Sequence, residues 1–152
     1  MRIALCSDEP YPVDDVIKQR LEAAGHEVMP FGAARTRQEA PWAEAAEEAA
    51  RAVAGGECDE GVFLCFTGTG ISIAANKVAG IRAALCTDPG TAAGARVWNH
   101  ANVLCLSHRL LSEEMAKEIL DTWFDTPRGV AGNDGVEKLK VIDRLHRAHR
   151  SP

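Results

Sequence analysis

Residues 65–70 combine a thiol with a glycine-containing loop and form the first candidate for chemistry. They read Cys65, Phe66, Thr67, Gly68, Thr69 and Gly70, at the end of the apolar run GVFLCF. The loop leads into a predicted helix, whose first backbone N–H groups have no intrahelical acceptor and are open to an anion. A thiol at such a place serves as a base or nucleophile, whereas a buried one is only a small hydrophobe. The segment matches neither the dinucleotide fingerprint nor the phosphate loop, so a plain tight turn is the alternative to an oxyanion site.

Further polar residues follow other predicted strands. Asp8 comes directly after the first apolar run, and Arg109 comes after the last one. In an open α/β sheet, ligands bind outside the carboxyl ends of the strands, where these side chains converge with Cys65. Asp8 is equally typical of a turn or helix cap, and Arg109 of a structural cation. Trp98 precedes the last strand and is a candidate for lining the cleft.

The elements that position these residues alternate along the chain. Apolar runs predict strands at residues 2–6, 27–31, 61–66, 82–86 and 101–106. Helical spacing predicts helices at residues 13–21, 42–54, 71–78, 89–98 and 112–124. This order implies a five-stranded parallel sheet with right-handed crossovers, in a single-domain, doubly wound, Rossmann-like α/β/α sandwich over residues 1–152.

The C-terminal part, residues 128–152, is predicted to be an arm that carries a helix. A turn-rich stretch at residues 127–135 is followed by apolar residues at Val136, Leu139, Ile142 and Leu145, which is helical spacing. Little of the sheet is left for this helix to cover. We therefore expect it to pack on a second subunit.

Composition narrows the class of protein. The 152 residues carry 17 Lys and Arg against 22 Asp and Glu, a net charge of −5, which disfavours nucleic-acid binding. No apolar run reaches membrane-spanning length, and the N-terminus does not resemble a signal peptide, so we expect a cytoplasmic protein without membrane contact. The five cysteines include no C-x-x-C pair, and the five histidines are dispersed, so we expect neither a metal nor another cofactor.

The sequence resembles the type B ribose-5-phosphate isomerase family, which includes the galactose-6-phosphate isomerase subunits. The resemblance is carried by CFTGTGISIAANK at residues 65–77 and GIRAALC at residues 80–86. Asn99, residues 101–104 and Arg109 continue it, and Ser7 with Asp8 fits the end of the first strand. Similarity extends over essentially the whole chain at lower density.

The resemblance implies reversible aldose–ketose isomerisation of a sugar phosphate, without a metal, through a cis-enediolate. Cys65 would move a proton between C1 and C2, and Thr67 would help to move protons between the two oxygens. The backbone N–H groups of residues 66–70, including Gly68, Thr69 and Gly70, would stabilise the enediolate. Asp8 and Asn99 would hold sugar hydroxyls, and Arg109 would help to bind phosphate. The resemblance also implies a homodimer, or a pair of dimers, with each active site completed by the partner subunit.

Four departures from the family pattern all concern substrate binding. Glu9 stands where the family commonly has a phosphate-facing histidine, and Trp98 stands where it has the histidine that helps to open the sugar ring. The second helix begins with Ala40-Pro41-Trp42 rather than with the usual tyrosine. The C-terminal arginines have no clear counterpart, which leaves Lys138, Lys140 or Arg128 as substitutes.

These observations predict a metal-independent isomerase of a small sugar phosphate, nominally converting ribose 5-phosphate to ribulose 5-phosphate. One alternative is the same chemistry on a tetrose, a hexose or a non-phosphorylated sugar, since an open-chain substrate needs no ring-opening histidine. The other alternative is a binding module that holds a sugar phosphate or another anion without turning it over.

Overall fold

Five parallel strands form the central sheet of the computed structural model, which describes residues 1–129 and 135–148. Their order across the sheet is β2-β1-β3-β5-β4. The strands are β1 (Arg2–Ser7), β2 (Glu27–Gly32), β3 (Glu60–Cys65), β4 (Ala83–Leu85) and β5 (Val103–Ser107). The parallel sheet confirms the prediction from alternating strands and helices. Strand β4 is shorter than predicted, and Arg82 beside it donates its backbone N–H to the side chain of Asn102 at 2.8 Å.

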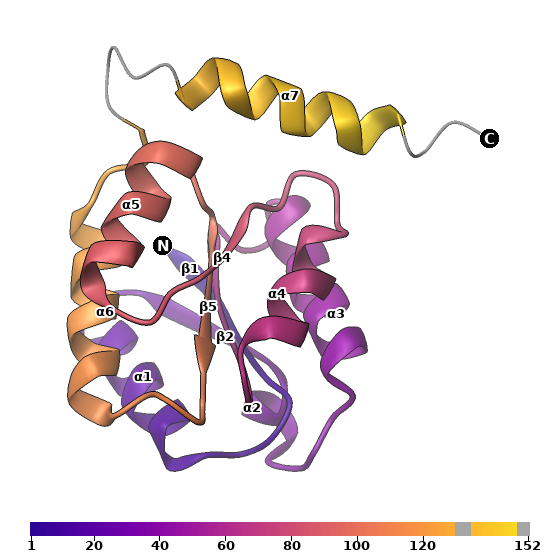
Figure 1. The fold of residues 1–152 in the computed structure, drawn as a ribbon. Coiled ribbons are helices and arrows are strands. Elements are labelled where there is room, and N and C mark those ends of the chain that lie inside the picture. Colours follow the sequence, from indigo (N-terminus) through magenta and orange to yellow (C-terminus); the bar gives the residue numbers. More distant parts are fainter. Residues whose placement is uncertain (130–134, 149–152) are drawn as a thin grey trace.

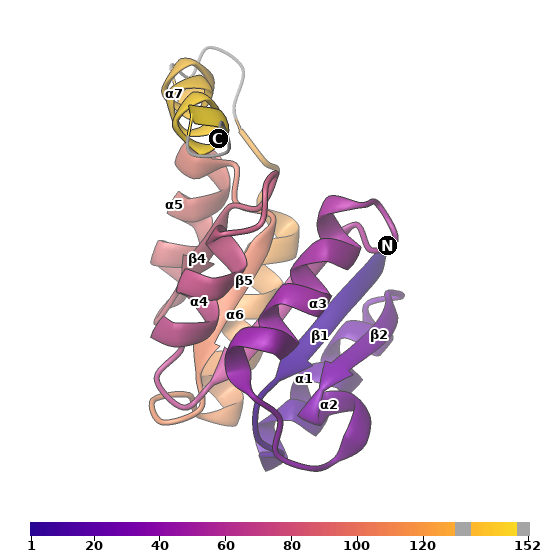
Figure 2. The same cartoon turned by 90° about the vertical axis from the view of Figure 1, so that its right-hand side faces the viewer.

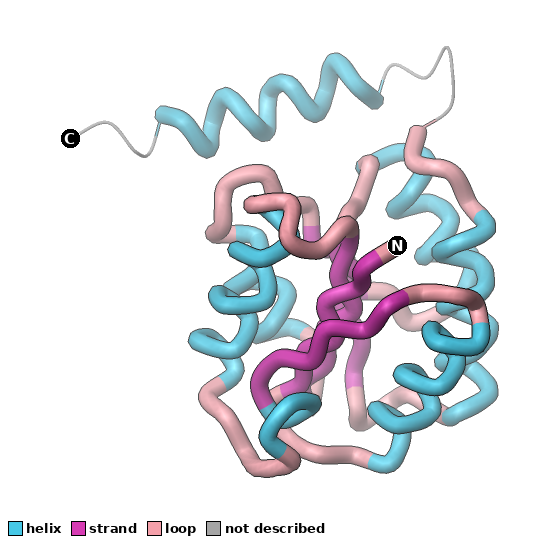
Figure 3. Tube along the Cα trace, turned by 180° about the vertical axis from the view of Figure 1, so that it is seen from behind, coloured by secondary structure: helices cyan, strands magenta, loops and turns pink. Residues whose placement is uncertain are grey.

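Helices cover both faces of this sheet, which confirms the predicted doubly wound sandwich (Figures 1 and 3). One face carries α1 (Pro12–Ala23), α5 (Pro89–Asn99) and α6 (Glu113–Asp125). The other carries α3 (Trp42–Ala54) and α4 (Thr69–Asn76). The one-turn helix α2 (Ala33–Thr36) was not predicted. The last helix is α7 (Gly135–Ala148).

The helix starts follow from side-chain capping in the sequence. Asp88 accepts the backbone N–H of Thr91 at 2.8 Å and so begins α5. Ser112 accepts the backbone N–H of Met115 at 3.2 Å and begins α6. Each contact satisfies an N–H that the first helical turn leaves unpaired. Asp88 is therefore a helix cap, although it follows a strand at the edge where ligands bind.

The two faces of the sheet bury different side chains. Large aliphatic residues, such as Ile3 and Leu64, face α1, α5 and α6 around the fully buried Trp123. Small residues and thiols, including Cys65, face α3 and α4, where α3 presents a row of alanines. Alternation along each strand separates the two sets. The thiol of Cys65 thus belongs to the layer beneath α3 and α4.

A buried ion pair closes the amino end of the sheet. The carboxylate of Glu60 accepts hydrogen bonds from Arg96 and from the indole of Trp123, both at 2.8 Å. Arg96 also donates to the backbone carbonyls of Ala101 and Thr126. A buried pair of charges is stable only when its remaining donors and acceptors are also paired, as they are here. The network joins the start of β3 to α5 and α6.

Helix α7 lies beyond the amino end of the sheet, next to α5 (Figures 1 and 2). Leu139 is its buried contact, whereas Val141 and Ile142 are exposed. Residues 130–134 and 149–152 of the predicted arm lie outside the described residues. The exposed apolar residues are consistent with the predicted packing on a second subunit, which stays a prediction. Among the described residues, no helix combines the length and apolar character that a membrane crossing requires.

Candidate active site

The carboxyl end of β3 positions the Cys65 thiol at the start of α4. Cys65 is the last residue of the strand and is 5% exposed. Gly68 then turns the chain with φ +76° and donates its backbone N–H to the Cys65 carbonyl at 3.2 Å. A Cβ atom on Gly68 would lie 2.9 Å from the carbonyl oxygen of Leu106. Only glycine therefore fits both the conformation and the space of this turn.

The end of β5 holds the same loop from the other side. The hydroxyl of Ser107 and the backbone N–H of Arg109 both donate to the Phe66 carbonyl, at 2.9 and 3.0 Å. The backbone N–H of His108 donates to the Cys65 carbonyl at 3.1 Å. These bonds fix the loop carbonyls, while the first N–H groups of α4 have no intrahelical acceptor. The result is a rigid set of donors suited to stabilising an oxyanion.

Exposed side chains of Thr67, Thr69 and Trp42 surround the loop. The hydroxyls of Thr67 and Thr69 lie 2.7 Å apart and both residues are exposed. Trp42, at the start of α3, lies against Gly70, where an added Cβ would come within 3.2 Å of the ring. Trp42 is 47% exposed and forms a wall beside the loop. The helix start at Ala40-Pro41-Trp42, one of the four departures from the family pattern, thus lies next to the candidate site.

Asp8 and Glu9 follow β1 at the same edge of the sheet, as predicted. Asp8 is 9% exposed, and burial raises the pKa of its carboxyl, an effect that the nearby charge of His108 opposes. Glu9 is half-buried and hydrogen-bonds to Tyr11, which raises the pKa of the Tyr11 phenol. Two carboxylates thus lie where the family pattern has one carboxylate and an imidazole.

His108 is the functional candidate that sequence reasoning missed. Its side chain is fully buried, and its Nε2 lies 2.8 Å from Oδ1 of Asp14. The ring stacks on Tyr11 with 4.1 Å between centroids, and its Nδ1 lies 4.0 Å from Oδ1 of Asp8. An imidazole therefore does lie at this edge, although it comes from the residue that directly follows β5. A histidine directly before the predicted phosphate ligand Arg109 was the available signal.

The other four cysteines are poor candidates for a base. Burial raises the pKa of Cys86 to about 12, and it also raises the pKa of the thiols of Cys6, Cys58 and Cys105. Each of these groups stays protonated at neutral pH, and a thiol accepts protons poorly. Among the described residues, no cluster of His, Cys, Asp and Glu has an arrangement that holds a metal ion.

Trp98 and Asn99 lie far from Cys65 within one chain. They end α5, which runs back from the carboxyl edge to the amino edge of the sheet. Three residues later, the backbone carbonyl of Asn102 accepts the N–H of Gly61 near the start of β3. Cys65 lies four residues further along this strand, a distance of about 13 Å. Trp98 is 60% exposed and cannot line a cleft around Cys65 of its own chain.

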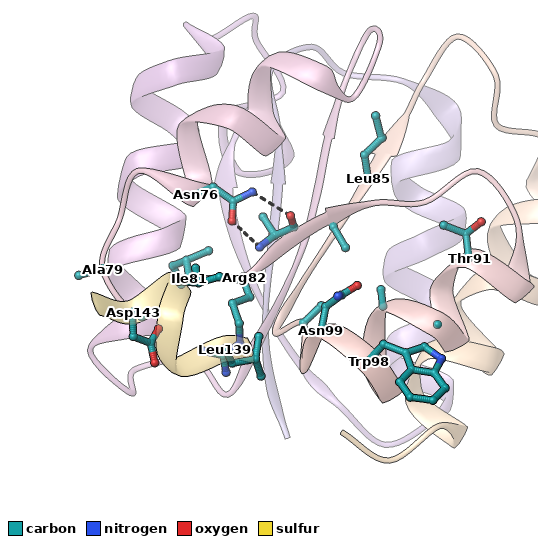
Figure 4. Close-up of a pocket in the computed structure, with 17 residues that line it drawn as sticks. Asn76, Ala79, Ile81, Arg82, Leu85, Thr91, Trp98, Asn99, Leu139 and Asp143 are labelled. Atoms are coloured by element: carbon teal, nitrogen blue, oxygen red, sulfur yellow. Dashed lines mark hydrogen bonds between the residues drawn. The ribbon is translucent and has the colours of Figure 1, made fainter. Parts of the chain in front are cut away.

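Instead, Trp98 and Asn99 line a separate cleft between β4, α5 and α7 (Figure 4). Asn76 forms one wall and is bonded to both backbone groups of Ala83, at 2.8 and 2.9 Å. Leu139 of α7 covers one side of this cleft. The predicted phosphate ligands Lys138 and Lys140 also belong to α7, away from Cys65. Arg128 lies 3.5 Å from the buried Glu60 and is part of the network at the amino edge.

Substituting Gly68 tests how much the close packing of this turn contributes to the free energy of unfolding. We expect Gly68→Ala to lower the free energy of unfolding by about 3 kcal/mol, because an unfavourable positive φ adds to the contact with the Leu106 carbonyl. Gly56 has φ +79° but nothing within 4 Å of an added Cβ, so Gly56→Ala should cost only about 1–2 kcal/mol. Urea unfolding of both variants measures this difference, and equal losses would contradict the close packing of the turn.

The doubly wound fold, with a thiol and a glycine turn at the carboxyl edge of its sheet, defines a class of small α/β enzymes. The Ribose/Galactose Isomerase family model matches residues 3–142. Ribose-5-phosphate isomerase B of Escherichia coli is 45% identical over 100 residues, covering 65% of this chain and 67% of the relative. D-erythrulose-4-phosphate isomerase of Pectobacterium atrosepticum is 36% identical over 126 residues, covering 82% and 83%.

Solved structures agree with this match. The structure of Clostridium thermocellum Ribose-5-Phosphate Isomerase B aligns with a TM-score of 0.91 at 36% identity, covering 98% of this chain and 99% of that one. The chain belongs to the ribose/galactose isomerase family, which confirms the resemblance seen in residues 65–109. It is an aldose–ketose isomerase of sugar phosphates, so the alternative of a binding module without turnover is set aside.

Proposed function

We propose that Cys65 is the base of this isomerase and that its substrate is a small aldose phosphate. The observation that carries the proposal is the thiol at the end of β3, beside a rigid turn and the free N–H groups at the start of α4. The Cys65 thiolate takes the proton from C2 of the aldose and returns it to C1, which yields the ketose. No metal or other cofactor has a role in this proposal.

The loop stabilises the charge that this step creates. Loss of the C2 proton leaves an enediolate. Its oxygen accepts from those backbone N–H groups of residues 66–70 that the turn does not use, including those of Thr69 and Gly70, since the N–H of Gly68 is bonded to the Cys65 carbonyl. The Thr67 hydroxyl, 2.7 Å from that of Thr69, moves a proton between the two substrate oxygens. Asp8 binds a sugar hydroxyl, and Arg109 binds the phosphate.

We propose a tetrose phosphate as the first candidate for the substrate. Trp98 occupies the position of the family's ring-opening histidine, and Glu9 replaces another histidine. A tetrose 4-phosphate has no free hydroxyl with which to close a five-membered ring, so it needs no ring-opening acid. The relative named D-erythrulose-4-phosphate isomerase, 36% identical, supports this choice. Ribose 5-phosphate is the second candidate, because a relative named ribose-5-phosphate isomerase B is 45% identical to this chain over 100 residues.

We further propose that the working enzyme is a homodimer, or a pair of dimers, with sites shared between subunits. Asn99 and Trp98 of one chain lie at the edge of the sheet opposite to Cys65, so they contribute to catalysis only in the site of a neighbour. Helix α7, with Lys138 and Lys140, extends from the same edge toward the partner. Such a two-fold arrangement builds two equivalent sites. The whole of residues 1–152, including the arm, acts in it as one domain, and we propose the cytoplasm as its location.

Proton exchange at C2 tests the substrate directly. The protein is incubated in deuterium oxide with erythrose 4-phosphate, ribose 5-phosphate, galactose 6-phosphate and their unphosphorylated forms, and proton NMR follows the C2 signal. We expect exchange with the tetrose phosphate at a kcat/KM at least about tenfold above that for ribose 5-phosphate, a difference of about 1.4 kcal/mol. Faster exchange with ribose 5-phosphate would favour the second candidate, and no exchange with any sugar would contradict the proposed function.

A further inference from the structure

His108 joins two buried aspartates from different parts of the chain. Its Nε2 lies 2.8 Å from Asp14 of α1, and its Nδ1 lies 4.0 Å from Asp8 after β1. The side chain of His108 has no exposed surface, whereas that of Asp8 is 12% exposed. Tyr11 stacks on the ring and fixes its plane. The His108 side chain therefore has no surface of its own with which to touch a ligand, whereas Asp8 beside it does.

The hydrogen bonds determine which ring nitrogen carries a proton. Asp14 accepts the backbone N–H of Tyr11 at 3.3 Å, so it acts as a carboxylate and Nε2 of His108 donates to it. Nδ1 of His108 and Oδ1 of Asp8 are buried and have no hydrogen-bond partner among the described residues. The two atoms are 4.0 Å apart, which is too far for a direct hydrogen bond but within the range of an ion pair. A buried carboxylate without a partner is costly, so a proton on Nδ1 of His108 would stabilise Asp8.

We propose that His108 is a positioning residue whose Nδ1 carries a proton toward Asp8, forming an ion pair that sets the charge and orientation of the carboxyl that Asp8 presents to the substrate. Burial of Asp8, which raises the pKa of its carboxyl, and the charge of His108, which lowers it, act in opposite directions. The other groups that face the pair are Asp14 and Tyr11 from the start of α1 and Glu9 beside Asp8.

This inference rests on the proposed function for its effect on the substrate, but its main test needs no substrate. The protein is labelled with ring ¹⁵N-histidine, and the His108 signal is identified by its loss in His108→Gln. Because the charge of Asp8 favours a proton on Nδ1, Asp8→Asn at a fixed, neutral pH should move the ¹⁵Nδ1 signal of His108 toward the range of an unprotonated ring nitrogen. Asp15→Asn is the matched control, because Asp15 lies on α1 but pairs with Arg37 at 2.8 Å. It should leave the ¹⁵Nδ1 signal of His108 unchanged.

Two substitutions of His108 separate positioning from structural support. The amide nitrogen of glutamine reaches about as far as Nε2, so His108→Gln keeps the hydrogen bond to Asp14 and loses the donor that faces Asp8. The amide of asparagine reaches about as far as Nδ1, so His108→Asn keeps a donor toward Asp8. With the best sugar phosphate of the exchange assay, we expect His108→Gln to raise KM about tenfold with kcat within about threefold. We expect His108→Asn to stay within about threefold of wild type in both.

The outcomes distinguish this inference from the proposed function. An unchanged ¹⁵Nδ1 signal of His108 in Asp8→Asn overturns the ion pair, whether or not a substrate has been found. A signal that moves while no sugar phosphate is turned over supports the pair and contradicts only the proposed function. Equal kinetic losses in His108→Gln and His108→Asn overturn the positioning role.

Discussion

Replacing Cys65 by alanine is expected to lower kcat for C2 proton exchange by about 10²–10⁴-fold, the usual contribution of a general base. The Cys65 thiol lies at the end of β3, beside the turn at Gly68. Without it, no other described cysteine replaces the base, since burial raises the pKa of the remaining four thiols. Substrate binding involves other groups, so KM should change by less than about threefold. The exchange assay in deuterium oxide measures both constants.

Cys58→Ala is the matched control for this substitution. Cys58 is also buried, at 1% exposure, but it precedes β3 at the amino edge, and its sulfur contacts Met29. We expect its kcat to stay within about twofold of wild type, because it touches nothing at the carboxyl edge. If Cys65→Ala keeps full turnover while circular dichroism shows a folded protein, the thiol is not the base. Equal losses in both variants would instead indicate a general effect of removing a buried thiol.

Most of the fold was predictable because its elements carry strong local signals. The strands β1, β3 and β5 are buried on both faces and are nearly continuous apolar runs. Proline and capping residues such as Asp88 and Ser112 mark the helix starts. Helix α2 was missed, since a single turn of four residues shows no periodicity. Family membership confirms the resemblance that residues 65–77 carried.

The site was predictable where it follows from strand direction. Parallel strands bring the residues after β1, β3 and β5 to one edge, and Asp8, Cys65 and Arg109 were identified on that basis. Trp98 was expected near this edge because it precedes β5. However, a helix that follows a parallel strand runs in the opposite direction, so the end of α5 lies at the amino edge.

His108 shows why other parts of the site did not follow from the sequence. Its partner Asp14 is 94 residues away in the chain and belongs to a helix on one face of the sheet. The contact requires the His108 side chain to point toward the face of the sheet that carries α1. It also requires Tyr11 to stack on the His108 ring. Neither spacing nor composition reports such a three-dimensional coincidence.

A mixed dimer of Cys65→Ala and Asn99→Ala chains should recover about half of the wild-type activity, although each parent is nearly inactive. In a two-fold dimer with shared sites, one site of the mixed dimer carries both substitutions, and the other has an intact Cys65 and an intact Asn99. The proposal needs this sharing because Asn99 ends α5 at the opposite edge of its own chain. Loss of a hydrogen bond to a sugar hydroxyl should cost the Asn99→Ala parent about 10–10²-fold in kcat/KM.

The experiment uses chains with two different affinity tags, co-expressed and purified through both tags, so that only mixed dimers are assayed. The matched control pairs Cys65→Ala with a chain that carries both substitutions, since that dimer contains no intact site and should stay inactive. Light scattering on the same samples reports the number of subunits. If the mixed dimer is no more active than its parents, then Asn99 lies outside the active site or belongs to the site of its own chain. The distance of about 13 Å along β3 argues against the second of these outcomes, because a side chain at the amino edge does not reach a substrate held at Cys65.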